Sequence, residues 1–431
     1  MRKTLLVGLV LTALALAGCG GGGGGSSVLT SSGGSSGSGS GGQTIASPAA
    51  NVVTMTVDSG PNGTAVDIPY ISVTLCVPGT AQCQTFNHIE VDTGSYGLRI
   101  VAGATDTSGN PFSLALPQET INGATVAECT QFVDGYSWGP MATADIDISG
   151  ESAQGVPVQV IGGDPNLAVP SACASTGSAE DTVSTFGANG ILGVGVFPQD
   201  CGQSCVTSAS YGYYYACPSG GACQGTTLPL AEQASNPVFD FPSDNNGVIV
   251  ELPPLGSSGI ATTASGALVF GIGTEGNNSL NAQTVLPANS SGDITTEYNG
   301  QSLPYSFFDT GSNAYYFVDS SIPDSCVSQA NWFCPSTTLQ LTALNTAQNG
   351  TQSTVAFSIA NAGTLFQQYP LPQYSAFANI GANSGNQSSF CPNQQTNCSF
   401  DFGLPFFFGR NVYVAFYGAL TSGGTGPYFA Y

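Results

Sequence analysis

The sequence is almost devoid of positive charge. Of its 431 residues only four are Lys or Arg, and two of these, Arg2 and Lys3, lie at the extreme N-terminus. The rest of the chain carries Arg99 and Arg410 against 26 Asp and Glu, so its formal net charge is 2 − 26 = −24. Such a surface repels phosphate backbones and anionic headgroups. We therefore expect no nucleic-acid partner.

Charged residues of either sign are also rare, at 7% of the chain, so solubility must rest on Ser, Thr, Asn and Gln. The high Gly and Ser content would suit a disordered chain, but 41% hydrophobic and 10% aromatic residues indicate a folded core. His88 is the only histidine, and no Cys-x-x-Cys occurs. We therefore expect neither a metal site nor a cofactor.

A long apolar run is missing as well. Leu5–Ala17 is apolar and follows Arg2 and Lys3, but it is too short for a membrane-spanning helix and is typical of a secretory signal. The run leads into Leu-Ala-Gly-Cys ending at Cys19, which resembles a bacterial lipobox, whose cysteine is acylated. We expect residues 1–19 to be a lipoprotein signal peptide with lipidation at Cys19. The alternative is a plain signal peptide with Cys19 free.

The next stretch fits a tethered domain. Gly20–Gly42 is almost entirely Gly and Ser, so residues 20–50 are expected to form a flexible linker. Gly20 directly follows the cysteine, where an Asp would suggest retention at the inner membrane. We expect an exported bacterial lipoprotein, a monomer held to the outer membrane by its lipid anchor and either periplasmic or surface-exposed.

Twelve cysteines remain beyond Cys19, an even number that predicts a disulfide framework in an exported protein. Three pairs are close enough in sequence to close short loops: Cys76/Cys83, Cys326/Cys334 and Cys391/Cys398. Spacing alone does not pair the other six: Cys129, Cys173, Cys201, Cys205, Cys217 and Cys223. For the last four of these a zinc site is the competing interpretation, which the scarcity of histidine disfavours.

From Asn51 onward, short β-rich runs alternate with Gly, Pro and Asn, as in Val52–Val57 and Ala144–Ile148. Period-two alternation is frequent and long helical periodicity is scarce, so we predict a mostly β fold. The chain is long enough for two domains or one bilobal domain. A sandwich or barrel binding protein could also give this strand pattern.

One tetrapeptide occurs twice in matching surroundings. Asp-Thr-Gly-Ser follows an apolar run at Asp92 and again at Asp309, 309 − 92 = 217 residues later. Gly94 and Gly311 permit a tight turn with close backbone approach. Two carboxylates brought face to face share a proton, so one can act as a base toward water while the other polarises a carbonyl. The alternative is that each copy is an ordinary Asp-initiated turn.

Further segments strengthen the pattern. "YSWGPMATADIDISG" begins at Tyr136, "NGILGVG" covers 189–195, and "FGLPFFFGRNVYVAFYG" covers 402–418. With the two DTGS copies, and in this order, they resemble the pepsin-like aspartic proteases over about residues 51–418. The chain also resembles a family of bacterial lipoproteins of unassigned function. It departs from the pepsin pattern at Arg99, where Trp is frequent, at Trp138 in the flap, and in the Cys- and Tyr-rich insertion 198–225.

The resemblance implies a bilobal double-β-barrel with an active-site cleft between the lobes. The N-terminal lobe would cover residues 51–262 with the first DTGS, the flap and the insertion, and the C-terminal lobe residues 263–431 with the second. Asp92 and Asp309 would be catalytic, and Tyr136, Trp138 and Gly139 would form a flap over the substrate. The residues that would support the pair are Thr93, Gly94, Ser95, Thr310, Gly311 and Ser312, of which each serine could donate a hydrogen bond to its own Asp.

The function expected from this resemblance is hydrolysis of peptide or protein substrates by a water activated between the two aspartates, favoured by acid. The alternative is a binding or structural lipoprotein that keeps the fold without turnover. Arg99 is open to two interpretations, a structural ion pair or a charge facing the cleft.

Overall fold

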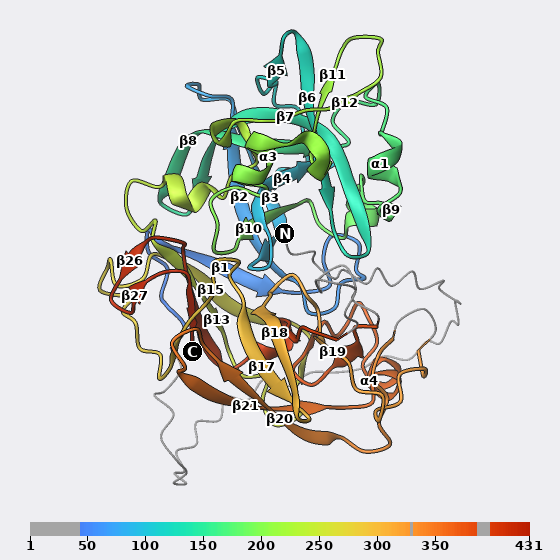
Figure 1. Ribbon diagram of the computed structural model, residues 1–431, viewed down its shortest axis with the longest axis vertical. Helices are drawn as coiled ribbons and strands as arrows, with labels where there is room; N and C mark the ends of the chain where they lie inside the picture. Colours follow the sequence, from blue (N-terminus) through green and yellow to red (C-terminus); the bar gives the residue numbers. More distant parts are fainter. Residues whose placement is uncertain (1–43, 328–330, 386–396) are drawn as a thin grey trace, which may run out of the picture.

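The computed structural model describes residues 44–327, 331–385 and 397–431 (Figure 1). Strands dominate, which confirms the expected mostly β class. The helices are short: α1 (Ser171–Ala174), α2 (Val183–Phe186), α3 (Gln203–Thr207), α4 (Ala362–Gln368) and the 3-10 turns η1 (Ala209–Tyr211), η2 (Leu230–Glu232), η3 (Pro237–Asp240) and η5 (Leu404–Phe406). Residues 1–43, which include the expected signal peptide, Cys19 and most of the linker, lie outside the described residues.

Six strands of the N-terminal half form a closed barrel. They are β2 (Pro69–Cys76), β3 (Cys83–Asp92), β4 (Tyr96–Val101), β7 (Gly135–Ile148), β8 (Glu151–Ile161) and β10 (Gly190–Val194). Hydrogen bonding runs β2–β3–β10–β4–β8–β7 and returns to β2. Period-two alternation explains the inward face, since Ile71, Val73 and Leu75 are buried while Ser72 between them is exposed.

A smaller sheet extends from the barrel along β7. Its strands are β5 (Thr120–Ile121), β6 (Ala124–Gln131), β9 (Ser178–Ala179), β11 (Tyr214–Cys217) and β12 (Gln224–Gly225). β6 and β7 form an antiparallel hairpin, β11 pairs with the other edge of β6, and β9 pairs with the start of β7. The hairpin is thus bordered on both sides, by the Cys-rich insertion and by the segment around β9.

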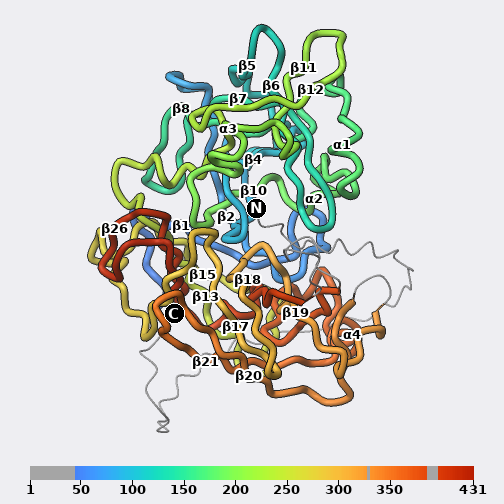
Figure 2. The backbone as a smooth tube through the Cα atoms, viewed as in Figure 1, coloured from blue at the N-terminus to red at the C-terminus, as the bar shows by residue number. Residues whose placement is uncertain are grey.

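A third group of strands joins the two ends of the chain. It comprises β1 (Val52–Val57), β13 (Gly247–Leu252), β15 (Ala264–Phe270), β16 (Val285–Pro287), β25 (Arg410–Ala415) and β28 (Tyr428–Ala430). They pair antiparallel in the order β1–β15–β13–β25–β28–β16, and β1 also pairs with β2 of the barrel. Figure 2 shows the chain path that brings the first and last strands together.

The C-terminal half builds a second, nearly closed sheet. Its strands are β17 (Ile294–Tyr298), β18 (Gln301–Phe308), β19 (Tyr315–Phe317), β20 (Leu339–Thr346), β21 (Gln352–Ile359), β23 (Gly381–Asn383) and β24 (Asp401–Phe402). They follow the order β21–β20–β17–β18–β24–β19–β23. Aromatic rings fill its interior: Phe400 stacks on Phe317 and on Phe402 with centroids 4.8 and 4.4 Å apart. Two small pairs complete the fold, β14 (Ile260–Ala261) with β22 (Ala376–Phe377) and β26 (Leu420–Thr421) with β27 (Gly424–Thr425).

The same arrangement of three paired strands, called a crossing below, occurs in both halves. β10 runs parallel to β3 and antiparallel to β4, and β24 runs parallel to β18 and antiparallel to β19. In each half the first of the three strands leads into a DTGS sequence, at Asp92 and at Asp309. The repeated tetrapeptide therefore occupies the same place in two similar strand arrangements.

Five disulfides lie among the described residues, consistent with an exported protein. Cys76–Cys83 and Cys326–Cys334 confirm the expected short loops. The remaining three are Cys129–Cys173, Cys201–Cys205 and Cys217–Cys223, so the four insertion cysteines form disulfides in place of the competing zinc site. Cys398 is disulfide-bonded, and its expected partner Cys391 lies outside the described residues. Within the described ranges no helix is long and apolar enough to cross a membrane.

Candidate active site

The fold brings the two DTGS aspartates together. Asp92 ends β3 and Asp309 follows β18, both side chains are fully buried, and the two carboxyl groups are hydrogen-bonded to each other. Gly94 packs directly on the second carboxyl, since a Cβ on Gly94 would lie 2.5 Å from Asp309 Cγ. Any larger residue at that position would collide with the pair.

Each carboxyl group is oriented by the backbone of its own turn. The Gly94 amide donates to Asp92 Oδ1 at 2.7 Å, and the Gly311 amide donates to Asp309 Oδ1 at 2.8 Å. The turns are equivalent because each carboxyl accepts from the amide two residues ahead, as Asp does when it starts a turn. The ordinary-turn interpretation is thus correct for the local geometry, while the meeting of the two turns lies beyond it.

The two threonines tie the turns to each other. Thr93 Oγ1 donates to the Phe308 carbonyl at 3.0 Å, and Thr310 Oγ1 donates to the Val91 carbonyl at 2.6 Å. In return each hydroxyl accepts from the other threonine's amide, at 3.1 and 3.0 Å. Both side chains are buried. These four reciprocal bonds join segments 217 residues apart and fix the distance between the aspartates.

The two serines differ from one another. Ser312 Oγ contacts Asp309 Oδ2 at 3.2 Å and also Asp401 Oδ2 at 2.6 Å. Ser95 Oγ is buried and has no hydrogen-bond partner among the described residues. The expectation that each serine donates to its own aspartate is therefore wrong for Ser95. The pair is symmetric in its backbone and asymmetric in its side-chain support.

Burial and neighbouring charge favour a proton on one member of the pair. Burial raises the pKa of Asp309 well above its usual value, and the charges of Asp92 and Asp401 and the hydrogen bond to Asp92 raise it further. The bond from the Gly311 amide acts in the opposite direction and is the weaker effect. A carboxyl held neutral beside a second carboxyl is the protonation state that general acid–base chemistry on water requires.

Two further acids lie beside the pair, and sequence reasoning missed both as site residues. Asp401 on β24 reaches Asp309 through Ser312. Glu90, two residues before Asp92, is fully buried, and its carboxylate oxygens have no hydrogen-bond partner in the described chain. Burial raises the pKa of Glu90, and Asp92 is the first of several acids that raise it further. Comparing the two halves could have revealed Asp401, because it replaces Ile191 at the matching position.

The expected flap residues lie on the β6–β7 hairpin, where Tyr136 and Trp138 pack with disulfide-bonded cysteines and Gly139 packs on β8. Tyr136 is only 8% exposed and packs in a cluster with Trp138 and the Cys129–Cys173 disulfide. Trp138 donates to the Leu167 carbonyl at 3.0 Å. A Cβ on Gly139 would collide with the backbone of β8. These contacts give the three residues packing roles, and a role over a substrate stays a prediction.

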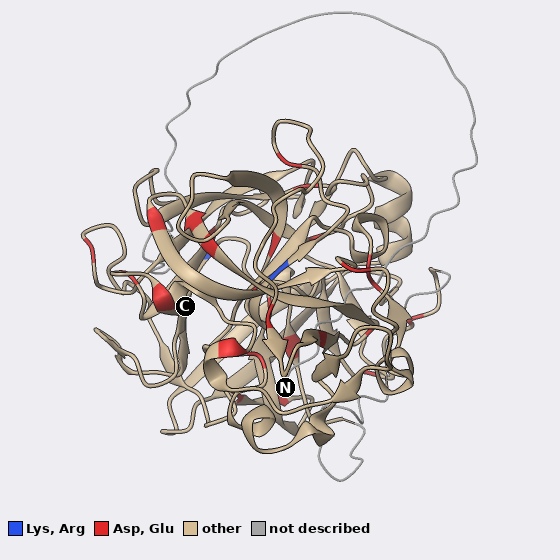
Figure 3. Ribbon diagram, turned by 90° about the horizontal axis from the view of Figure 1, so that it is seen from above, with Lys and Arg blue, Asp and Glu red and all other residues tan. Residues whose placement is uncertain are grey.

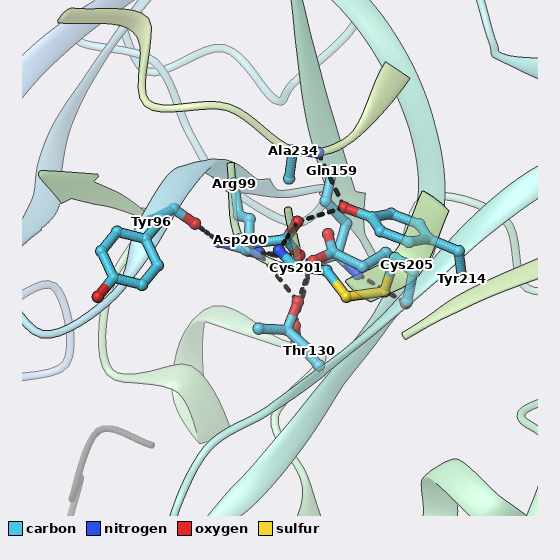
Figure 4. Close-up of polar contacts among 11 residues, drawn as sticks. Tyr96, Arg99, Thr130, Gln159, Asp200, Cys201, Cys205, Tyr214 and Ala234 are labelled. Carbon is cyan, nitrogen blue, oxygen red and sulfur yellow. Dashed lines mark hydrogen bonds and ion pairs between the residues drawn. A yellow bond between two sulfur atoms is a disulfide. The ribbon is translucent and has the colours of Figure 1, made fainter. Parts of the chain in front are cut away.

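Arg99 forms a buried network that locks β4 to the hairpin and the insertion (Figure 4). Its guanidinium contacts Glu128 Oε1 at 2.5 Å, Asp200 Oδ2 at 3.2 Å and Thr130 Oγ1 at 2.8 Å. Tyr214 donates to the other oxygen of Asp200 at 2.5 Å. Glu128 and Asp200 raise the pKa of Arg99, although burial alone would lower it. Of the two interpretations, the contacts support the structural ion pair.

A cavity of about 650 Å³ lies between the two halves. Tyr96, Phe197 and Leu230 line it from one half, and Tyr305 and Phe307 from the other. Tyr96 follows Asp92 by four residues and Phe307 precedes Asp309 by two, so the cavity is close to the pair in sequence. Neither aspartate lines it, because both are fully buried.

The buried acids give a pH prediction. Figure 3 shows Asp and Glu at several places in the fold. Burial raises the pKa of Asp67 and Glu90, and burial next to Asp134 raises that of Glu180 to about 9. The folded chain then holds protons that the unfolded chain releases above about pH 4, so stability falls as pH rises from there. The pKa values of Asp58 and Asp319 are lowered, so these two groups make stability rise with pH. They do so only near or below about pH 4, where the unfolded carboxyl groups titrate.

We therefore expect the melting temperature to be higher at pH 5 than at pH 8, measured by circular dichroism. Asp67→Asn should reduce the slope, because it removes one buried group that ionises. A melting temperature that rises from pH 5 to pH 8 would contradict this assignment of protons.

No curated protein matches the chain. One family model matches residues 47–431, which include both aspartates, the hairpin and all the sheets described above. That family has no assigned function, in agreement with the coarser part of the resemblance seen in the sequence. The chain belongs to the family described as "Protein of unknown function (DUF3443)".

Proposed function

We propose that the protein is an aspartic-type endopeptidase with a pepsin-like bilobal architecture, whose catalytic pair is Asp92 and Asp309. One observation carries the proposal: two buried, mutually hydrogen-bonded carboxyl groups lie on equivalent turns joined by reciprocal threonine bonds. The raised pKa of Asp309 supplies the second requirement, a proton retained between two acids. Substrates would be peptides or proteins, and the chemistry assigned to these side chains uses no cofactor.

In the proposed reaction Asp309 is neutral and Asp92 is ionised. Asp92 takes a proton from a water molecule, whose oxygen forms a bond to the peptide carbonyl carbon while Asp309 donates its proton to the carbonyl oxygen. The C–N bond of the tetrahedral intermediate then breaks as Asp92 gives its proton to the leaving amine. Asp309 takes the proton of one hydroxyl of the intermediate, which becomes the carbonyl of the acid product, and the pair returns to its starting state. Because both carboxyl groups are buried, the reaction requires a motion that admits water and substrate.

The proposal extends to location. Export is consistent with the disulfides, and the lipobox-like sequence ending at Cys19 supports attachment of a monomer to the outer membrane through a lipid. The domain would then act on peptides in the periplasm or at the cell surface.

A binding or structural role is the second candidate, and one observation favours it. The pair is fully buried, and the hairpin that would have to open is hydrogen-bonded on both sides, by β11 and by β9. A fold that keeps its acids while sealing them could hold a peptide in the neighbouring cavity without cutting it.

Cleavage of a peptide library between pH 3 and pH 8 separates the two candidates. We expect cleavage to be greatest below neutrality, because the pair must keep one proton. Peptide mimics that carry a hydroxyl at the position of the scissile bond should block it by placing that hydroxyl between the aspartates. If the protein binds library peptides but cuts none at any pH, the binding role replaces the peptidase.

A further inference from the structure

The two halves differ in one buried residue beside the carboxyl pair. In the first half Ile191 of β10 pairs with the strand that ends at Asp92. In the second half Asp401 of β24 holds the matching place, paired with Phe307, and is 2% exposed. An acid therefore replaces an apolar residue at the core of one crossing, where its burial costs stability. Such a cost at a buried position points to a role in the chemistry of the pair.

The link between Asp401 and the pair is a single hydroxyl group. Ser312 Oγ has one hydrogen and two carboxyl neighbours, Asp401 Oδ2 at 2.6 Å and Asp309 Oδ2 at 3.2 Å. A separation of 2.6 Å is typical of a hydroxyl donating to an ionised carboxylate, and 3.2 Å is long for any O–H···O bond. The hydrogen is therefore assigned to Asp401, and Ser312 presents lone pairs to Asp309.

We propose that Asp401 is a positioning residue: by taking the Ser312 hydrogen, its carboxylate keeps the acidic proton on Asp309 next to Asp92. An ionised Asp309 would gain no hydrogen bond from Ser312 and would face a second negative charge. Its catalytic meaning rests on the proposed peptidase function, but retention of the proton can be measured without turnover.

Other groups near Asp309 act in the same direction or are neutral. Asp92 is in direct contact with Asp309. Glu90 lies on the Asp92 side of the pair, and burial raises its pKa, so its neutral form is favoured. From β19, Tyr316 lies close to both Asp309 and Asp401, and burial followed by the charge of Asp401 raises the pKa of its hydroxyl, so it stays neutral. The first half has no equivalent link, since Ser95 Oγ has no hydrogen-bond partner in the described chain. The asymmetry assigns the retained proton to Asp309.

The test replaces Asp401 by Asn, which keeps the shape and removes the charge, and separately by Val, which is apolar like Ile191. In both variants the Ser312 hydrogen can turn to Asp309 and stabilise its ionised form. The pH at which Asp309 loses its proton should fall by about one unit or more, the size of shift that one nearby charge produces. Infrared absorption of protonated carboxyl groups measures this, with Asp309→Asn identifying the Asp309 band.

The alkaline limb of the pH–rate profile should move by the same amount in the same direction. Asp319→Asn is the matched control, because Asp319 also accepts hydroxyl bonds, from Ser321 at 2.6 Å and Tyr298 at 2.7 Å, within the same half. It should leave the Asp309 band unchanged. If the band moves but wild type cleaves no peptide, the positioning role stands and the peptidase proposal fails. If neither Asp401 variant moves the band relative to wild type, the positioning role is overturned.

Discussion

Arg99→Met is expected to lower the free energy of unfolding by about 3–5 kcal/mol, the loss typical when one partner of a buried ion pair is removed. Met keeps much of the length of the side chain but leaves Glu128 and Asp200 buried next to each other without their counter-charge. The hydrogen bonds to Thr130 and to the Tyr96 carbonyl are lost as well. Urea unfolding at pH 7 measures the change.

Arg410→Met is the matched control, since Arg410 is the other arginine outside the N-terminus and is only partly buried. It donates to the Phe406 carbonyl and lies 4.4 Å from the centre of the Phe406 ring, so its loss should cost about 1 kcal/mol. The cost of Arg99→Met should shrink at acidic pH, where Asp200, whose pKa burial and Glu128 raise, takes up a proton. Equal losses of unfolding free energy in Arg99→Met and Arg410→Met would contradict the importance of the buried ion-pair network.

Asp92→Asn and Asp309→Asn are each expected to lower kcat/KM by a factor of about 10²–10⁴ or more, the contribution of a positioned acid or base. Asn has the shape of Asp but cannot hold or release the shared proton. Asp309→Asn should perturb the fold little, because Asn has the shape of Asp and burial already disfavours the charged form of Asp309. Cleavage of the best library peptide at its optimal pH is the measurement.

Asp67→Asn is the control for this pair of variants. Asp67 is also fully buried with a raised pKa, and it accepts a backbone bond from Phe377 at 2.7 Å, but it is no part of the two turns. The kcat/KM of the Asp67→Asn variant should stay within a few-fold of the wild-type value. If Asp92→Asn or Asp309→Asn retained wild-type activity, the peptidase proposal would be refuted.

The sequence predicted the parts of the fold that depend on local pattern. Runs such as Val52–Val57 predicted strands, and the close cysteine spacings predicted two of the described disulfides. The repeated DTGS predicted that Asp92 and Asp309 would meet, and the structure places their carboxyl groups in contact. Each of these signals lies within a short stretch or in an exact repeat, which is why one sequence was sufficient.

What depends on three-dimensional partners was not predictable. Nothing near Ser95 in the sequence says that its hydroxyl lacks a partner, whereas Ser312 differs only because Asp401, 89 residues later, folds against it. The charged contacts of Arg99 come from two segments distant in the sequence, β6 and the Cys-rich insertion, so its role could only be left open. Tyr136 was assigned from its distance after Asp92, but the Cys129–Cys173 disulfide and the insertion decide what it packs against.

The low exposure of the two arginines also determines how the protein responds to trypsin-like proteases. Trypsin-like enzymes cut after Lys or Arg, and beyond the N-terminus the chain offers them only Arg99 and Arg410. Arg99 is buried between β4 and the β6 and insertion residues that it bonds, and the strand that begins at Arg410 pairs with β13. A bond in a paired strand cannot enter a protease active site until that strand detaches. We therefore expect the folded domain to resist trypsin. The rate at which trypsin cleaves it should then measure how often the strands that carry Arg99 and Arg410 open.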